Sequence, residues 1–219
     1  MQGFFMPLTF MTSDNWLLKT HLPLIANKYC FQLWEQYRFQ LKVTVPRKTK
    51  LGDYRFRAKE KAHLITINSN LNPYAFLIVY LHEVAHCFTT IKHGLGTKPH
   101  GRYWQHEMIL LLDPLLMQDI FPKEIEEALS SYLKAPKATS CAHPSLTRAL
   151  RRYDPPSDLV ALDRLPEDVE FLFQSRRYRK IKVRRTRVSC LEMGRKRTYL
   201  ISKLAMIQPL GNNGNSGSN

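Results

Sequence analysis

The sequence predicts an α+β protein: a mixed helix-and-sheet domain followed by a small basic β module. Three observations carry this prediction. The stretch AFLIVYLHEVAHCF is apolar over helical length and follows a run rich in β-branched residues, 63–69. From residue 168 onward, alternating strand-like runs replace helical patterns. Hydrophobic residues make up 44% of the 219, which is enough for a packed core.

The first elements are a long helix and three strands. Apolar residues recur at helical spacing over 14–40, and we expect Trp16 and Trp34 to lie in the core of that helix. Residues 41–45 alternate as a strand that ends at Pro46. A turn at Leu51-Gly52-Asp53 precedes two further strands, 54–58 and 63–69.

Helices dominate the next segment. Asn72-Pro73 predicts the start of a helix that carries the histidines, and a Gly/Pro loop follows at 94–99. Further helices are predicted near 101–112, 122–133 and 145–153. We expect a domain over 1–135, a proline-punctuated connector over 136–167, two or three antiparallel strands within 168–210 joined at Met193-Gly194, and a disordered tail over 211–219.

The run HEVAH, His82 to His86, fits the pattern H-E-x-x-H. Residues i and i+4 lie one above the other on a helix, so His82 and His86 can bind one Zn²⁺. Glu83 is rotated off that axis and can take a proton from water, while zinc supplies Lewis-acid chemistry at a peptide carbonyl. An ionised carboxylate in so apolar a helix is costly unless a metal compensates it. The motif therefore predicts a zinc-dependent peptidase with Glu83 as the catalytic base.

A catalytic zinc site needs a third protein ligand. The candidates are His93, His100, His106 and Glu107. His100 is favoured because it follows a Gly/Pro loop and precedes Gly101, which lets the chain return to the metal. His93 is two turns beyond His86 on the same helix, and His106 requires a second helix packed across the first. Thr89 and Lys92 occupy the positions where a metzincin has Gly and His, so that class is excluded.

HEVAH, followed fourteen residues later by the His-Gly of HGRYW, resembles the SprT-like (Spartan-related) zinc metallopeptidase family, as does the preceding KLGDYRF…HLITINSNL. The resemblance covers about residues 13–112. It implies a zincin-like domain whose HExxH helix packs on a small antiparallel or mixed sheet. It also implies one Zn²⁺ held by His82, His86 and His100, with Glu83 as general base. A sheet edge would bind an extended peptide by strand addition, and the substrates would be proteins associated with DNA, as in DNA–protein crosslink repair or transcription.

Many SprT-like proteins carry a Cys-rich zinc ribbon after the protease domain, and this chain departs from that pattern. Downstream of the motif there are only Cys141 and Cys190, with His143 nearby, so we do not expect a second zinc. The four cysteines form no C-x-x-C pair, which favours a reducing compartment. Residues 1–6 lack the features of a signal peptide, and the apolar stretch 74–84 is short for a bilayer. We therefore expect a cytoplasmic protein with no membrane partner.

The formal net charge of +15 is concentrated near the C-terminus, where 176–203 holds twelve Lys or Arg and one acid. Its densest part alternates as a strand with one basic face, which predicts salt-dependent contact with DNA phosphates. The residues expected on that surface are Arg176, Arg177, Arg179, Lys180, Lys182, Arg184, Arg185 and Arg187. The alternative function is a non-catalytic DNA-binding or transcription-associated protein with a structural zinc. The complete H-E-x-x-H argues against it, because a structural site has no use for the glutamate.

Overall fold

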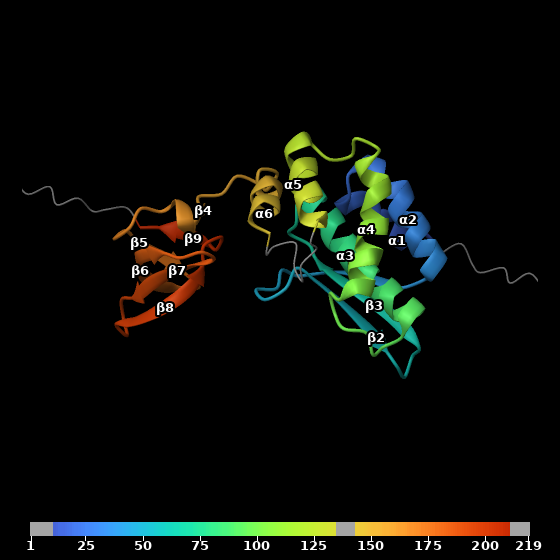
Figure 1. The fold of residues 1–219 in the computed structure, drawn as a ribbon, viewed down its shortest axis with the longest axis horizontal. Coiled ribbons are helices and arrows are strands. Elements are labelled where there is room, and N and C mark those ends of the chain that lie inside the picture. The colour runs from blue at the N-terminus through green and yellow to red at the C-terminus, as the bar shows by residue number, and fades with distance from the viewer. Residues whose placement is uncertain (1–10, 135–142, 211–219) are drawn as a thin grey trace, which may run out of the picture. The chain divides into compact units, whose positions relative to one another are not determined.

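A computed structural model describes residues 11–134 and 143–210 and has a mixed α+β fold (Figure 1). The chain divides into two compact units, Met1–Asp154 and Pro155–Asn219. The sequence predicted a connector over 136–167, but helix α6 (Pro144–Arg151) packs against α5 (Lys123–Leu133) in the first unit. Asn72 Nδ2 reinforces this by donating to Leu150 O and to Asp154 Oδ1. Residues 135–142 and the tail 211–219 lie outside the described residues.

The N-terminal helix is interrupted. Instead of one helix over 14–40, the structure has α1 (Met11–His21), the 3-10 turn η1 (Leu24–Ala26) and α2 (Asn27–Tyr37). Pro23 causes the break, because it lacks an N–H and disfavours helical backbone at the residue before it. The interruption also changes which face is buried. Trp34 lies in the core as expected, whereas the prediction for Trp16 is wrong, since it is 64% exposed.

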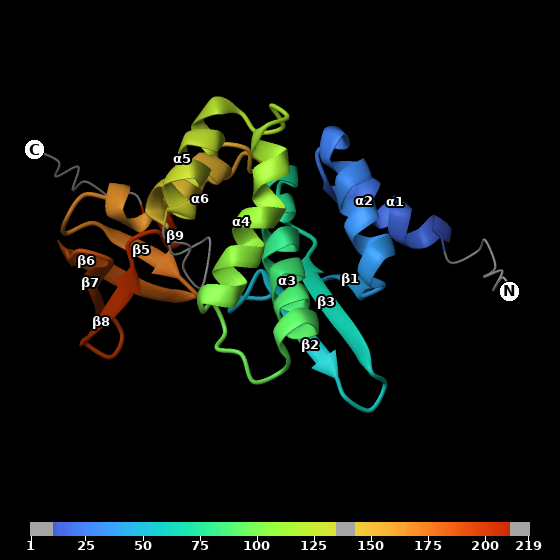
Figure 2. The same cartoon turned by 45° about the vertical axis from the view of Figure 1, so that its right-hand side comes forward.

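A three-stranded mixed sheet follows, with strand order β1-β3-β2. The strands are β1 (Gln40–Thr44), β2 (Gly52–Arg57) and β3 (Ala62–Asn68), close to the predicted ranges. β1 is parallel to β3, and β2 is antiparallel to it. This order leaves β2 at an edge of the sheet, next to the long helix that carries the histidines (Figure 2).

That helix, α3 (Pro73–His93), is the centre of the first unit's core. Asn72 caps it by accepting the Ala75 N–H at 2.9 Å, and Pro73 occupies its first turn, where a missing N–H costs nothing. Within the described residues, α3 alone is long and apolar enough to cross a membrane. However, 72% of its apolar window is buried inside the protein, as in a core helix.

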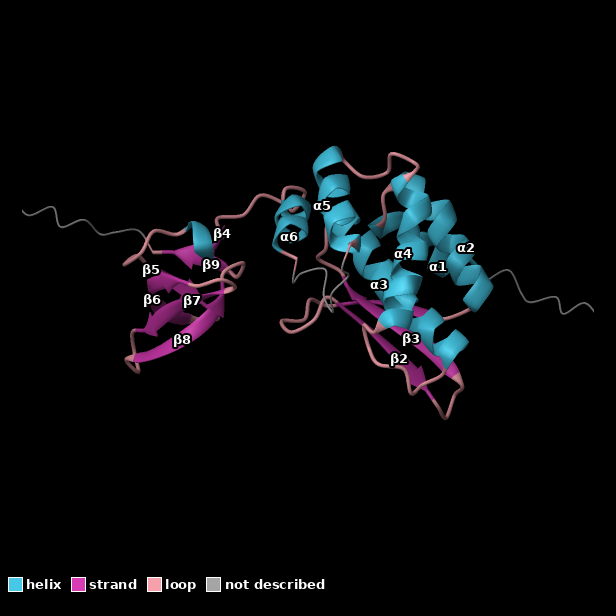
Figure 3. Cartoon of the chain, viewed as in Figure 1, coloured by secondary structure: helices cyan, strands magenta, loops and turns pink. Residues whose placement is uncertain are grey.

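Helix α4 (Arg102–Leu116) packs along α3, and α5 and α6 complete the helical layer (Figure 3). An ion pair between the exposed Lys92 and the buried Glu107 joins α3 and α4. Lys92 Nζ lies 2.8 Å from Glu107 Oε2 and 3.0 Å from Oε1, and Glu107 is 3% exposed. Because both carboxylate oxygens are satisfied, this contact fixes the α3–α4 pairing beside the histidines.

The second unit is an antiparallel sheet with strand order β4-β9-β5-β6-β7-β8. It is larger than the two or three strands predicted, because the range 168–210 holds five strands and β4 lies before it. The strands are β4 (Val160–Ala161), β5 (Glu170–Phe173), β6 (Arg176–Val183), β7 (Arg187–Glu192), β8 (Arg197–Ser202) and β9 (Met206–Pro209), with the turn η3 (Leu162–Arg164) after β4. Phe171, Tyr178 and Ile207 belong to its separate hydrophobic core.

Candidate metal centre

Three histidine nitrogens meet in the first unit. The Nε2 atom of His86 lies 3.3 Å from that of His82 and 2.9 Å from that of His100, and the His82 and His100 atoms are 3.2 Å apart. His82 and His86 are one turn apart on α3, whereas His100 comes from the loop after it. Three donor atoms from two segments therefore converge on one point, and these residues could hold a metal ion.

The spacing fits a small tetrahedral ion. With Zn–N bonds of about 2.0–2.1 Å, the nitrogen ligands of a tetrahedral zinc are about 3.3–3.4 Å apart. The observed separations of 2.9–3.3 Å are close to that edge length. Among the described residues, no fourth His, Cys, Asp or Glu joins the cluster. Three protein ligands with one open position is the arrangement of catalytic zinc sites.

The protonation state also suits metal binding, which needs neutral imidazole. Burial, together with the neighbouring His86 and His100, lowers the pKa of His82 to about 3. Burial, then His100, lowers the pKa of His86 to about 4, and burial lowers the pKa of His100. At neutral pH the imidazoles of His82 and His86 are therefore uncharged, which is the form that coordinates a metal ion.

A tight turn places His100. Its backbone is left-handed (φ 58°), and the Gly101 N–H donates to Lys98 O at 3.0 Å. A Cβ on Gly101 would lie 2.9 Å from that carbonyl oxygen, so the turn requires glycine. Gln105 Nε2 donates to His100 O at 3.2 Å and holds the turn from the first turn of α4.

Trp104 packs beneath the three histidines. It is fully buried, and its ring centroid lies 4.7, 5.4 and 4.8 Å from those of His82, His86 and His100. Its indole Nε1 donates to His82 O at 3.3 Å. A rigid aromatic surface in contact with all three imidazoles restricts their rotation, which orients the nitrogens before a ligand binds.

Glu83 lies in the same cleft as the three histidines and is 6% exposed. Burial, together with the nearby Asp53, raises the pKa of its carboxyl to about 8. Arg47, Lys50 and the backbone N–H of Tyr54, which donates to the carboxylate, act in the opposite direction. A carboxyl whose pKa is near neutrality can both accept and return a proton, and a bound cation would favour its ionised form.

Gly52 and Tyr54 on β2 are the residues that sequence reasoning missed. A Cβ on Gly52 would lie 2.5 Å from Glu83 Oε1, so glycine admits the carboxyl at this point. The Tyr54 ring is parallel to that of His86 (6°, centroids 6.3 Å apart), and its hydroxyl bonds His63 Nδ1 at 2.8 Å. The one available signal was Gly52 in the strand ahead of the motif, since an isolated strand glycine often marks a close approach.

The cleft has a volume of about 750 Å³ and runs along the open edge of β2. The Asn68 N–H donates to Leu51 O (2.8 Å), and antiparallel hydrogen-bonded pairs recur at every second residue. The main-chain groups of Gly52, Tyr54 and Phe56 therefore point away from β3. Apart from the Tyr54 N–H that Glu83 uses, these groups are available to a ligand in the cleft.

The other ligand candidates lie elsewhere. His93 is exposed and stacks on Tyr103 with centroids 4.0 Å apart, and His106 is exposed on α4. Glu107 is buried but engaged by Lys92. His143 contacts the Tyr132 ring and Ser145, whereas Cys141 lies outside the described residues. His100 is therefore the candidate that the fold brings to His82 and His86.

Of the basic residues predicted to contact DNA between Arg176 and Arg187, only some are exposed to solvent and without an ion-pair partner in the described part of the chain. Lys180, expected on the basic face, is 2% exposed, and its Nζ donates to Leu165 O and to Asp163 O. Tyr178 and Lys180 alternate as buried residues of β6, so the prediction for Lys180 is wrong; the register shift between Lys180 and Lys182 then ends the alternation and leaves Lys182 exposed. Arg177 and Arg179 are exposed but both bond Glu170. The remaining predicted residues are exposed: Arg176, Lys182, Arg184, Arg185 and Arg187.

Comparison with known protein families, with curated proteins and with solved structures finds no match to this chain.

Proposed function

We propose that this protein is a zinc-dependent endopeptidase of SprT-like type with a zincin-like first unit. The observation that carries the proposal is the convergence of His82, His86 and His100 beside the buried carboxyl of Glu83. His82, His86 and His100 would hold one Zn²⁺ and leave a position open toward the cleft. A structural zinc in a non-catalytic protein, the alternative, would favour four protein ligands, and the cluster has three.

When bound, Zn²⁺ supplies Lewis-acid chemistry that acidifies water and polarises the carbonyl of the scissile bond. Glu83 would act as the general base and then as the general acid. Its carboxylate accepts a proton from the attacking water and returns it to the amide nitrogen that leaves. Gly52 and the Tyr54 N–H hold that carboxylate against β2, on the wall of the cleft where the peptide lies.

The open edge of β2 supports an extended peptide as substrate. The main-chain groups of Gly52, Tyr54 and Phe56 that point away from β3 repeat every second residue, which is the spacing with which a peptide strand pairs, and of these the Tyr54 N–H is used by Glu83. Strand pairing binds the backbone and depends little on side chains. A peptide bound in this way would run past both Glu83 and the histidine cluster.

The experiment compares Glu83→Gln with the wild-type protein and with Glu60→Gln, the same change at an exposed turn. We expect all three proteins to contain one zinc per chain by elemental analysis. Wild type and Glu60→Gln should digest casein or histone, and Glu83→Gln should be inactive. Full activity of zinc-loaded Glu83→Gln would remove Glu83 from the mechanism. Inactivity of zinc-loaded wild type on every protein substrate, with and without DNA, would refute the peptidase proposal.

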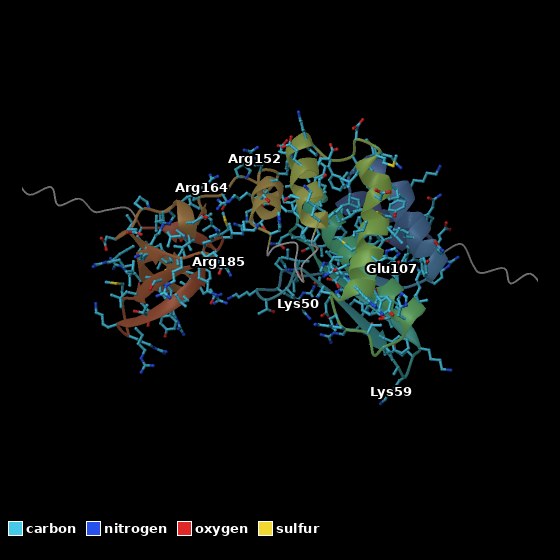
Figure 4. The ribbon with its side chains drawn as sticks, viewed as in Figure 1. Lys50, Lys59, Glu107, Arg152, Arg164 and Arg185 are labelled. Atoms are coloured by element: carbon cyan, nitrogen blue, oxygen red, sulfur yellow. The ribbon has the colours of Figure 1, made fainter. Side chains whose placement is uncertain are left out.

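We propose DNA as a partner of the second unit, so that the substrates are proteins associated with DNA. The support is the turn between β6 and β7, where Lys182, Arg184, Arg185 and Arg187 are exposed together (Figure 4 labels Arg185). Such a cluster binds phosphates without sequence preference. The described cysteines, Cys30, Cys87 and Cys190, are buried free thiols, which is in keeping with the proposed cytoplasmic location.

DNA binding is tested on the full chain. We expect the logarithm of the binding constant to fall with the logarithm of salt concentration, and Arg184→Gln/Arg185→Gln to reduce the slope by about 1.8. Lys59→Gln/Lys61→Gln removes the same charge from the turn between β2 and β3 and should leave the slope unchanged. Equal slopes for all three proteins would exclude this turn as the DNA contact.

A further inference from the structure

We propose that the cleft selects peptides that carry acidic side chains beside the bond to be cleaved. This inference rests on the proposed peptidase function and names its substrate class. The edge of β2 would bind the peptide backbone, and lysines around the cleft would contact the peptide's side chains. Glutamate or aspartate next to the scissile bond would favour binding, and lysine or arginine would oppose it.

The charges that line the cleft are unbalanced. Apart from Glu83 and the histidines, the charged residues there are Lys48, Lys50, Asp53, Arg55 and Lys98. Four are basic and one is acidic. A low-dielectric cleft lined mostly by one sign of charge raises the local concentration of groups of the opposite sign.

The single acid is already neutralised. Asp53 lies 2.7 Å from Lys50 Nζ through one carboxylate oxygen and 2.7 Å from Arg55 Nε through the other. Burial raises the pKa of Asp53, but its hydrogen bonds to Lys50 and Arg55 outweigh burial and hold the pKa below its usual value. Asp53 is therefore ionised at neutral pH, and each of its carboxylate oxygens is paired with a cation. Its carboxylate is thus not available to pair with a basic side chain of a peptide.

Two of the lysines are unpaired. Lys48 and Lys98 are exposed, and neither has an ion-pair partner among the residues that the structure describes. Lys48 and Lys50 lie on the loop between β1 and β2, and Lys98 lies on the loop that carries His100. The cations therefore come from two loops that meet the same cleft, so an extended peptide can contact them with more than one side chain.

The occupant is a peptide and not nucleic acid because of the cleft's size and chemistry. A volume of about 750 Å³ holds a few residues of an extended chain. Single-stranded nucleic acid binds on exposed aromatic platforms, whereas in this cleft Trp104 is fully buried, and Tyr54 and Phe56 are partly buried and pack against the His63 ring. The row of free main-chain groups on β2 matches a peptide backbone.

The experiment uses zinc-loaded full chain and three peptides built around one cleavage site mapped in casein by mass spectrometry. The positions flanking the site are all Glu, all Ser or all Lys. At low salt we expect kcat/KM to be about tenfold higher for the Glu peptide than for the Lys peptide, because each exposed ion pair contributes two- to fivefold. High salt should reduce the ratio toward one, since screening weakens exposed pairs.

Matched variants locate the preference. Lys48→Glu/Lys98→Glu should abolish or reverse it. Lys59→Glu makes a like change at the turn between β2 and β3, outside the cleft lining, and should keep it (Figure 4 labels Lys50 and Lys59). Equal kcat/KM for the Glu and Lys peptides, or an unchanged preference in the double variant, would overturn the inference. A third result would also overturn it: an oligonucleotide inhibits the wild type, the double variant escapes this inhibition, and the enzyme shows no preference between the peptides. Cleavage of the Ser peptide in such a case would leave the proposed function standing.

Discussion

Gly52 is a suitable site for a substitution that disturbs Glu83, because its Cα side faces α3 with no room for a Cβ. In Gly52→Ala, the new Cβ would lie 2.5 Å from Glu83 Oε1, 2.8 Å from Glu83 Cγ and 2.7 Å from Val79 Cγ1. All three distances are far inside van der Waals contact, so the strand or the Glu83 side chain must move. Overpacking of this kind costs about 1–3 kcal/mol of unfolding free energy.

The expected effect on catalysis is larger than that on stability. Moving a catalytic group by about 1 Å lowers the rate by about 100-fold, and Glu83 is the group displaced. Zinc content should stay at one per chain, because neither Gly52 nor Val79 touches the histidine nitrogens. We therefore expect kcat to fall about 100-fold, KM to change little, and the unfolding free energy in urea to fall by about 2 kcal/mol.

Two controls make this result interpretable. Gly96→Ala adds the same methyl group where nothing lies within 4 Å, so kcat and stability should match wild type. Val79→Ala combined with Gly52→Ala removes one of the three contacts and should recover part of the stability, measured as the coupling in a double-mutant cycle. Its activity should stay low, because Glu83 is still displaced. Wild-type kcat in Gly52→Ala would refute the role of this contact in positioning Glu83.

Three further predictions test the site and the second unit. His100→Ala should lose stoichiometric zinc by elemental analysis and His93→Ala should keep it; equal zinc in both would contradict the ligand assignment. In metal-free protein, burial raises the folded pKa of Glu83 to about 8, so its contribution to stability is full below its ordinary pKa and is lost as pH rises through 8. Between pH 5 and pH 8 this amounts to about 3–4 kcal/mol, which Glu83→Gln should abolish in urea unfolding with chelator; identical pH dependence of both proteins would exclude it. Lys180→Met should destabilise the second unit by about 1–3 kcal/mol, because two buried carbonyls lose their donor, and should leave the salt dependence of DNA binding unchanged; a reduced slope would mean that Lys180 reaches the phosphates.

The parts of the site that could be predicted are those set by local geometry. His82 and His86 follow from helical spacing, and Glu83 follows from its place between them. The third ligand required knowing which face of α4 is buried. Trp104, Glu107 and Met108 point inward, so His106 points out, and His100 was favoured from the loop alone.

The parts that could not be predicted depend on contacts distant in sequence or on irregular backbone. Gly52 matters because α3 lies against it, thirty residues later in the chain. Lys180 is buried because it shares the core face of β6 with Tyr178, and a one-residue bulge then exposes Lys182, so a single basic face through both lysines could not be predicted correctly from a period of two. The break of the N-terminal helix at Pro23 was readable in principle, but the apolar spacing continues across the proline and concealed it.

The open edge of β2 has a consequence for the protein in solution. A strand that can receive a peptide can equally receive the same strand of another copy, and unpaired edges of this kind seed aggregation. Arg55 lies on β2, and Lys48 and Lys50 lie on the loop that leads into it, so two copies brought edge to edge would bring like charges together. The positive charges beside the open edge would therefore oppose pairing between the β2 strands of two copies, while the edge itself stays open to a peptide.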